Sequence, residues 1–319
     1  MASEEDVSQY FRGTHEVQEC LEGQGEAHLK TYNAKCTKNP GHTRFIPVKT
    51  LTLQHFPSGY QDNDLFDLIK AMSDVTVRIY AKFTSFDRPE FITGTTDRYP
   101  FYASRGMHKL RSGSGRVYHV DKYSEEKHNM TCPCPECVVS PTPSKVWWKV
   151  GILTARHVVF DSSEARQSSC RLWFDEEKCP VVKIYGWTLD ASDTDMDRCR
   201  MHCVTHDLAL GEKLKDMYMN FFRLYCKVKD KYKCHNGMDK LTIIVSHPHG
   251  CSKQVSIGNW VHKQKLERRT RYTYTTCTCP GSSGAIVYRV GGPWSSAHHN
   301  SGGTPSGLNY SGAWKDSTG

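Results

Sequence analysis

A glycine-rich turn, Cys-Pro-Gly-Ser-Ser-Gly-Ala at residues 279–285, carries a candidate nucleophile, Ser283. It leads directly into the apolar residues 286–288, which indicates a turn that joins two strands. Small residues let a carbonyl group approach closely, and such a turn can direct the amides of Gly281 and Ser283 at a developing oxyanion. Glycine and serine also mark ordinary loops, so this stretch by itself is compatible with a plain turn.

Two further stretches hold groups that would activate a serine hydroxyl. His157 lies in an apolar run over residues 151–160, and Asp207 precedes the apolar residues 208–210. A serine is a weak nucleophile until a base takes its proton, and the base needs an acceptor that holds its second ring nitrogen. Taken separately, His157 could be a core histidine and Asp207 a capping residue. The order His, Asp, Ser, each in an apolar setting, favours a catalytic triad.

These three motifs resemble those of the chymotrypsin-like (trypsin-fold, PA clan) serine proteases. Thr-Ala-Arg-His-Val at residues 154–158 is similar to the family's histidine motif, and Asp-Leu-Ala-Leu at residues 207–210 to its aspartate motif. Gly-Ser-Ser-Gly-Ala at residues 281–285 resembles its nucleophile motif. As a pattern of strands, the resemblance covers residues 70–315. It implies a serine endopeptidase whose substrate is a protein or peptide.

The resemblance also implies roles for individual residues. Ser283 would attack the scissile carbonyl, His157 would act as base and then acid, and Asp207 would orient His157. The amides of Gly281 and Ser283 would form the oxyanion hole. Secreted digestive members carry an aspartate before the nucleophile, which pairs with a new N terminus after cleavage, but this chain has Ser282. The chain therefore looks more like intracellular, bacterial or viral members.

The family's first specificity pocket is lined by residues just before the nucleophile and by the strand that follows it. Here these positions are Cys277, Thr278, His298 and His299. Because no aspartate stands at the base of this pocket, a substrate Arg or Lys would lack a counter-charge. Thr278 together with His298 resembles the glutamate- and glutamine-selective bacterial and viral members. We therefore expect Glu or Gln before the scissile bond, at the position called P1.

The strand patterns predict an all-β fold of two six-stranded antiparallel barrels, with the active site in the cleft between them and an N-terminal extension. Short alternating segments rich in β-branched and aromatic residues are separated by Gly, Pro and Asp. Residues 64–72 have helical spacing, and residues 207–210 are expected to be the last strand of the first barrel. The expected parts are an extension over 1–70, a first barrel over 71–212, a linker over 213–240 and a second barrel over 241–319.

A cysteine-rich insertion over residues 121–145 is a candidate structural zinc site. Cys132, Cys134 and Cys137 stand on a proline-stiffened loop and are suited to a soft cation. A fourth ligand would come from His128 or from a distant cysteine. Because a second Cys-x-x-Cys pair is missing, a loop of free thiols is the alternative. His206 is expected beside the active site, and catalysis itself needs no cofactor.

Composition limits the classes of function. With 38% hydrophobic and 24% charged residues the chain is globular, and no apolar run approaches the roughly 20 residues that a membrane helix needs. The acidic and polar stretch over residues 1–6 argues against a secretory signal, so we expect a cytoplasmic protein whose 14 cysteines are thiols or metal ligands. The net charge of +8 comes without a nucleic-acid-binding motif, which argues against a nucleic-acid partner. A catalytically latent interaction module and a metal-bound scaffold are the alternatives to a protease.

Overall fold

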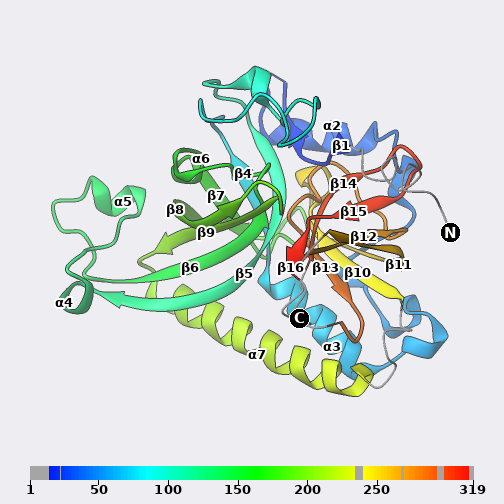
Figure 1. Cartoon of the computed structure of the whole chain (residues 1–319). Coiled ribbons are helices and arrows are strands. Elements are labelled where there is room, and N and C mark those ends of the chain that lie inside the picture. Colours follow the sequence, from blue (N-terminus) through cyan, green and yellow to red (C-terminus); the bar gives the residue numbers. More distant parts are fainter. Residues whose placement is uncertain (1–13, 22, 234–239, 267–268, 293–297, 316–319) are drawn as a thin grey trace.

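The computed structural model describes residues 14–21, 23–233, 240–266, 269–292 and 298–315, and it is mostly β with several helices (Figure 1). Within these residues the strands are β1 (Thr14–His15), β2 (Gln18–Glu19), β3 (Phe45–Pro47), β4 (Thr76–Ala81), β5 (Arg111–Ser124), β6 (Val146–Ala155), β7 (Ser168–Leu172), β8 (Val182–Asp193), β9 (Arg198–Thr205), β10 (Leu241–Ser246), β11 (Gln254–Leu266), β12 (Arg269–Tyr274), β13 (Ile286–Arg289), β14 (His298–Gly303), β15 (Asn309–Ser311) and β16 (Trp314–Lys315). The α-helices are α2 (Leu29–Ala34), α3 (Asn63–Val75), α4 (Glu125–His128), α5 (Pro135–Val138), α6 (Ser162–Arg166) and α7 (Leu208–Tyr232). None of the helices in this part of the chain is both long and apolar enough to cross a membrane.

The first sheet closes into a six-stranded antiparallel barrel. Its strands follow the order β5, β4, β7, β8, β9 and β6, and β6 pairs back with β5. The short β2 adds to the free side of β5. Closing the sheet leaves no long exposed edge and fixes the ends of β6 and β9, which lead to the candidate site.

The second sheet also closes on itself. Its order is β12, β15, β14, β13, β10 and β11, and β11 pairs with β12. The short strands β3, β16 and β1 add to β11, β12 and β14. The predicted outline of two barrel-like sheets is therefore confirmed, but the helices make the chain mostly β rather than all-β.

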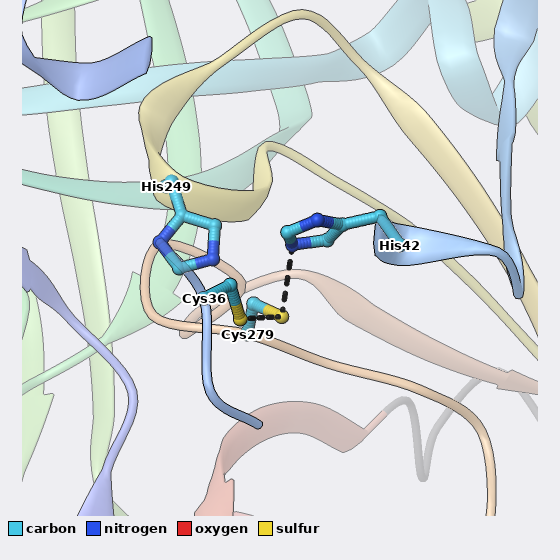
Figure 2. A group of neighbouring side chains, drawn as sticks. All are labelled: Cys36, His42, His249 and Cys279. Carbon is cyan, nitrogen blue, oxygen red and sulfur yellow. Dashed lines mark hydrogen bonds between the residues drawn. The ribbon is translucent and has the colours of Figure 1, made fainter. Parts of the chain in front are cut away.

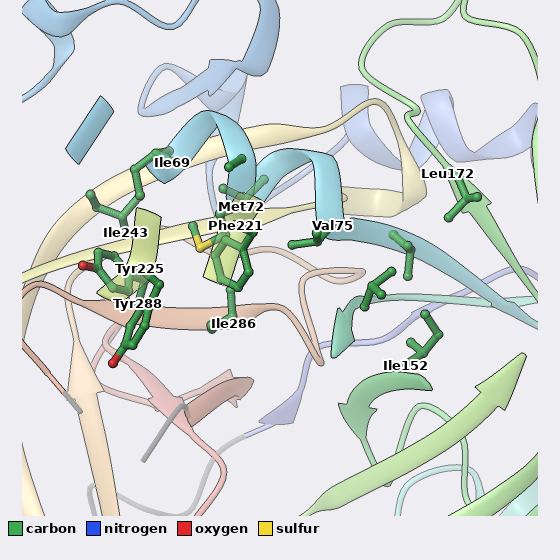
Figure 3. Close-up of a cluster of buried hydrophobic side chains, with 14 of the residues drawn as sticks. Ile69, Met72, Val75, Ile152, Leu172, Phe221, Tyr225, Ile243, Ile286 and Tyr288 are labelled. Atoms are coloured by element: carbon green, nitrogen blue, oxygen red, sulfur yellow. The ribbon is translucent and has the colours of Figure 1, made fainter. Parts of the chain in front are cut away.

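Helices α3 and α7 pack against each other along one side of both sheets (Figure 1). Their buried side chains join the cores of the two sheets into one cluster, which includes Met72 of α3, Phe221 of α7, Ile152 of β6 and Ile286 of β13 (Figure 3). The predicted helix over residues 64–72 is confirmed as part of α3. Residues 213–232, predicted to be a linker, form most of α7 and connect the two sheets as a packed helix.

The first turn of α7 replaces the strand predicted over residues 207–210. Asp207 is the N-cap of this helix, and its Oδ1 accepts a hydrogen bond from the amide of Leu210 at 2.9 Å. An aspartate before an apolar run suits a helix start as well as a strand end, and the short run cannot separate the two. The sixth strand of the first barrel is instead β9.

Candidate active site

His157 follows the end of β6 and is fully buried. Its Nδ1 lies 2.7 Å from Oδ2 and 2.9 Å from Oδ1 of Asp197, and its backbone amide donates to Oδ1 at 3.0 Å. These three contacts to one carboxylate fix both the ring and the loop that carries it. Nε2, the other ring nitrogen, is buried and has no hydrogen-bond partner among the described residues. A base held in this way can accept a proton at Nε2.

Asp197 ends the turn between β8 and β9 and has a positive φ of 50°. The Ser301 hydroxyl of β14 donates a short hydrogen bond to its Oδ2, which ties the first sheet to the second. Burial by itself would raise the pKa of the Asp197 carboxyl, but the charge of His157 and its hydrogen bond to the carboxylate hold that pKa well below the usual 3.8. Asp197 is therefore an anion at neutral pH.

The prediction that Asp207 orients His157 is wrong about the residue, because Asp197 occupies that place and Asp207 caps α7. Three aspartates stand at the end of β8 and in the turn that follows it, at positions 193, 195 and 197. Aspartates are common in turns, so nothing in their pattern distinguishes Asp197 before the strands are paired.

The nucleophile turn lies between β12 and β13, and two glycines give it its shape. Gly281 has φ +97° and Gly284 has φ +87°, a region that other residues rarely adopt. A Cβ on Gly284 would lie 2.1 Å from the Ser114 carbonyl oxygen, and one on Gly281 would lie 2.6 Å from the His247 carbonyl oxygen. Both positions therefore require glycine on steric as well as conformational grounds.

Hydroxyl groups hold the nucleophile turn in place. The Ser282 hydroxyl accepts a hydrogen bond from the amide of Cys279 at 3.2 Å and lies 3.1 Å from the Ser246 hydroxyl. From the first sheet, the Ser114 hydroxyl donates to the Gly281 carbonyl and the Ser114 amide donates to the Ser283 carbonyl, both at 2.8 Å. The turn is thus fixed by neutral contacts from both sheets.

The N-terminal segment, residues 14–19, runs between the two sheets and across the nucleophile turn. The Glu16 carbonyl oxygen accepts hydrogen bonds from the amides of Gly281 at 2.7 Å and Ser283 at 3.3 Å. The Glu16 amide donates to the Ser301 carbonyl at 3.3 Å and to the Ser283 hydroxyl at 3.1 Å, and that hydroxyl donates to the Ser301 carbonyl at 3.1 Å. The peptide group that follows Glu16 therefore lies directly beside Ser283.

Strand pairing anchors this segment on both sides of Glu16. Before it, β1 pairs antiparallel with β14, and after it, β2 pairs antiparallel with β5. The His15 ring packs on the His157 ring with centroids 4.3 Å apart. This main-chain pairing is how sheet edges recognise extended peptides.

The buried Glu16 carboxylate is held by two side chains. Lys38 Nζ makes a short ion pair with Oε1, and Asn300 Nδ2 donates to Oε2 at 3.2 Å. Lys38 Nζ also donates to Thr278 Oγ1 at 3.3 Å and to Asn309 Oδ1. No motif surrounds Lys38, so its sequence context does not distinguish it from the other lysines of the chain.

The four residues predicted to line the specificity pocket have different places. Thr278 contacts Lys38 rather than Glu16, and Cys277 packs in a small apolar cluster with Phe45. The His298 ring is buried, with Nδ1 2.9 Å from the Gly312 carbonyl oxygen. Nε2 of His299 lies 3.9 Å from Asp197 Oδ2. The described contacts of these residues therefore give none of them a hydrogen bond to the Glu16 carboxylate.

The predicted cysteine site gains a fourth side chain. Sulfurs of Cys132, Cys134 and Cys137 and a ring nitrogen of His206 all lie within 4.8 Å of one another. Nδ1 of His206 is 3.2 Å from the Cys134 sulfur and 3.5 Å from that of Cys137. The prediction that His206 lies beside the active site is therefore wrong, because its ring contacts these cysteines instead. His128 stacks on Tyr123 instead, at 4.0 Å between ring centroids.

Comparisons with known proteins give weak structural matches. No protein-family model matches the chain, and neither does any curated protein. The HtrA-type protease AlgW with a decapeptide is 13% identical with a TM-score of 0.41, and the match covers 77% of this chain and 63% of that one. The Rv3671c protease in an inactive form is 11% identical with a TM-score of 0.40, covering 79% and 90%.

The chain thus spans less than two thirds of the AlgW chain that it matches. The similarity to these proteases is one of overall fold. At this level of likeness neither catalytic residues nor substrates transfer to the chain.

Proposed function

We propose that this chain is a serine endopeptidase in which Ser283 is the nucleophile, His157 the base and Asp197 the residue that orients the base. The observation that carries the proposal is the Glu16 carbonyl, which accepts hydrogen bonds from the Gly281 and Ser283 amides beside the Ser283 hydroxyl. A carbonyl in this position is where charge develops in acyl transfer.

The chemistry follows from these contacts. The Ser283 hydroxyl turns away from the Ser301 carbonyl and gives its proton to Nε2 of His157, which is free to accept it. Asp197 stabilises the imidazolium that forms. The Gly281 and Ser283 amides then stabilise the oxyanion, and His157 returns the proton to the leaving amine. Water completes the reaction by hydrolysing the acyl-enzyme.

The test is labelling with a fluorophosphonate probe. Because the N-terminal segment covers Ser283, the parent for this experiment is the Glu16→Lys chain, in which a second cation beside Lys38 disfavours docking of the segment. We expect this parent to label and its Ser283→Ala and His157→Ala variants to remain unlabelled. Ser306→Ala, which changes an exposed serine, is the matched control and should label as the parent does.

Labelling that persists without His157 would reject the triad. A parent that fails to label although the segment is displaced would reject the peptidase and favour a latent module that binds peptides. Displacement is checked independently by hydrogen exchange at residues 14–19.

We also propose a structural zinc ion held by Cys132, Cys134, Cys137 and His206. Three cysteines and one histidine are a set that favours tetrahedral zinc. Glu136 supports the histidine, because its Oε2 lies 3.6 Å from Nε2 of His206, the nitrogen that faces away from the sulfurs. Trp147 and Val204 pack beneath the loop. The purified Cys134→Ser variant should contain one equivalent of zinc less than the wild type, and an equal zinc content in the two proteins would reject the site.

A further inference from the structure

We propose that the chain cleaves itself between Glu16 and Val17, which makes its own N-terminal segment the first substrate. This inference rests on the proposed peptidase activity and adds the identity of the bond and of the P1 side chain. The segment is seated as a substrate on both sides of that bond, because β1 pairs with β14 before Glu16 and β2 pairs with β5 after Val17.

The register points to one peptide bond. Of residues 14–19, the described hydrogen bonds bring only the Glu16 carbonyl to the amides of Gly281 and Ser283. The neighbouring contacts agree, since Thr14 lies opposite Gly303 and His15 opposite Gly302, which leaves the Glu16 amide for the Ser301 carbonyl. Shifting the segment by one residue would place either His15 or Val17 in the buried position of Glu16, and neither side chain could pair with Lys38 there.

The P1 side chain is recognised by charge. The carboxylate of Glu16 is almost fully buried, and Lys38 and Asn300 together contact both of its oxygens. Asn300 is held in turn, since its Oδ1 accepts a hydrogen bond from the Tyr274 hydroxyl at 2.6 Å. A glutamine would fit the shape but lose the ion pair, so the site is built for glutamate.

The bonds balance without any co-reactant other than water. Ser283 Oγ bonds to the Glu16 carbonyl carbon while its proton passes to His157 Nε2. The bond between Glu16 and Val17 then breaks, and the same proton goes to the Val17 nitrogen, which becomes a new N terminus. Water hydrolyses the ester that remains between Glu16 and Ser283, leaving a Glu16 carboxylate.

Intact-mass measurement and N-terminal sequencing of the purified full chain test this proposal. Wild type should convert to a species that begins at Val17, at a rate independent of protein concentration, whereas Ser283→Ala should stay whole. A wild-type chain that remains whole while the Glu16→Lys chain labels with the fluorophosphonate would overturn self-cleavage and leave the peptidase standing. If Glu16→Lys also fails to label, the peptidase itself has failed.

Selectivity is tested at Lys38. Lys38→Met should slow self-cleavage about 10- to 100-fold, because a buried carboxylate loses its charged partner. Pairing Lys38→Met with Glu16→Gln should recover part of the rate, since the neutral amide needs no counter-charge. Lys35→Met is the matched control on the same segment, where the lysine is exposed, and should cleave as wild type does. Equal rates for Lys38→Met and Lys35→Met would overturn the assignment of Lys38.

A separate observation carries a second proposal, a divalent-cation site of the zinc class formed by Cys36, His42, His249 and Cys279. Figure 2 shows these four side chains converging from three parts of the chain: residues 36–42, the turn after β10, and the nucleophile turn. One ligand atom of each lies within 4.8 Å of the others. The two sulfurs are 3.6 Å apart, and Nε2 of His42 is 3.5 Å from the Cys279 sulfur.

The surroundings of this cluster suit a metal. Nδ1 of His249 lies 2.8 Å from the Gln18 side-chain oxygen and therefore carries the proton, which leaves Nε2 as the ligand nitrogen. That Nε2 is buried and has no hydrogen-bond partner among the described residues. Asn39 donates its backbone amide to the Cys36 sulfur at 3.4 Å and its side-chain amide to the Cys279 sulfur at 3.2 Å. Such donors stabilise thiolates.

The cation would also fix the pocket for Glu16. Lys38 and Asn39 lie within the segment that Cys36 and His42 would tie to Cys279. Zinc analysis of purified protein tests the site. The double variant Cys36→Ser with Cys279→Ser should lose one equivalent of zinc relative to wild type, while Cys226→Ser, at an exposed cysteine of α7, should lose none. An unchanged zinc content in the double variant, or a Cys36–Cys279 disulfide in peptide maps of wild type, would overturn it.

Discussion

Asp197 holds His157 through three contacts, two to the ring nitrogen Nδ1 and one to the backbone amide. Asp207, by contrast, serves helix α7. We therefore expect Asp197→Asn to lower kcat/KM about 10⁴-fold, since the amide would favour the wrong tautomer of His157. Asp207→Asn should leave kcat/KM unchanged, and Asp207→Ala should cost about 1 kcal/mol of stability through loss of the cap. Hydrolysis of a peptide that spans residues 12–21 measures the first effect. A larger loss of kcat/KM in Asp207→Asn than in Asp197→Asn would contradict the structure.

His157 and Ser283 were within reach of sequence reasoning because their neighbours constrain them. His157 stands at the end of a long apolar strand, and Ser283 stands between two glycines that a tight turn requires. The strands could be predicted because side chains alternate between the two faces of a sheet, so apolar and polar residues alternate along the sequence.

Asp197, Glu16 and Lys38 were out of reach because tertiary pairing alone brings them to the site. Asp197 acts through the β8–β9 turn, which resembles any acidic turn until β9 pairs with β6. Glu16 and Lys38 belong to a polar segment whose short strands β1 and β2 form only against β14 and β5. Two-residue strands carry no periodic signal.

The buried carboxylate of Glu164 supports the histidine loop. It accepts hydrogen bonds from Arg88 at 2.7 and 2.8 Å and from Arg111 at 3.0 Å, and Arg88 also donates to the His157 carbonyl at 3.1 Å. Glu164→Ala should lower the free energy of unfolding by about 3–5 kcal/mol, because two buried cations lose their partner. Urea unfolding measures this effect. Glu176→Ala, which breaks an exposed pair with Lys49, is the control and should cost less than about 1 kcal/mol.

Gly211 lets α7 approach the first barrel closely. A Cβ at this position would lie 2.1 Å from the indole of Trp148, which is itself almost fully buried. Gly211→Ala should destabilise the protein by about 1–3 kcal/mol, because overpacking outweighs the roughly 1 kcal/mol that alanine gains over glycine in a helix. Gly59→Ala, where a Cβ meets nothing within 4 Å, is the matched control for thermal unfolding. Equal melting temperatures for the two variants would argue against this close contact.

Docking of the N-terminal segment should weaken as the pH falls below neutrality, because His15 must stay neutral to remain in place. Burial, and then the charge of His157, lower the pKa of His15 from 6.5 to about 3 in the docked state, with Arg271 and Arg88 acting in the same direction and Asp197 opposing them. The released histidine, with the higher pKa, takes up the proton first, so docking is strongest above pH 6.5 and is lost on acidification. Between pH 7 and pH 5 the docking constant should fall about 25-fold. Hydrogen exchange at residues 14–19 of the uncut Ser283→Ala chain, corrected for intrinsic rates, measures this docking constant. Adding His15→Phe should remove its pH dependence. A pH dependence that survives this substitution would assign it to another group.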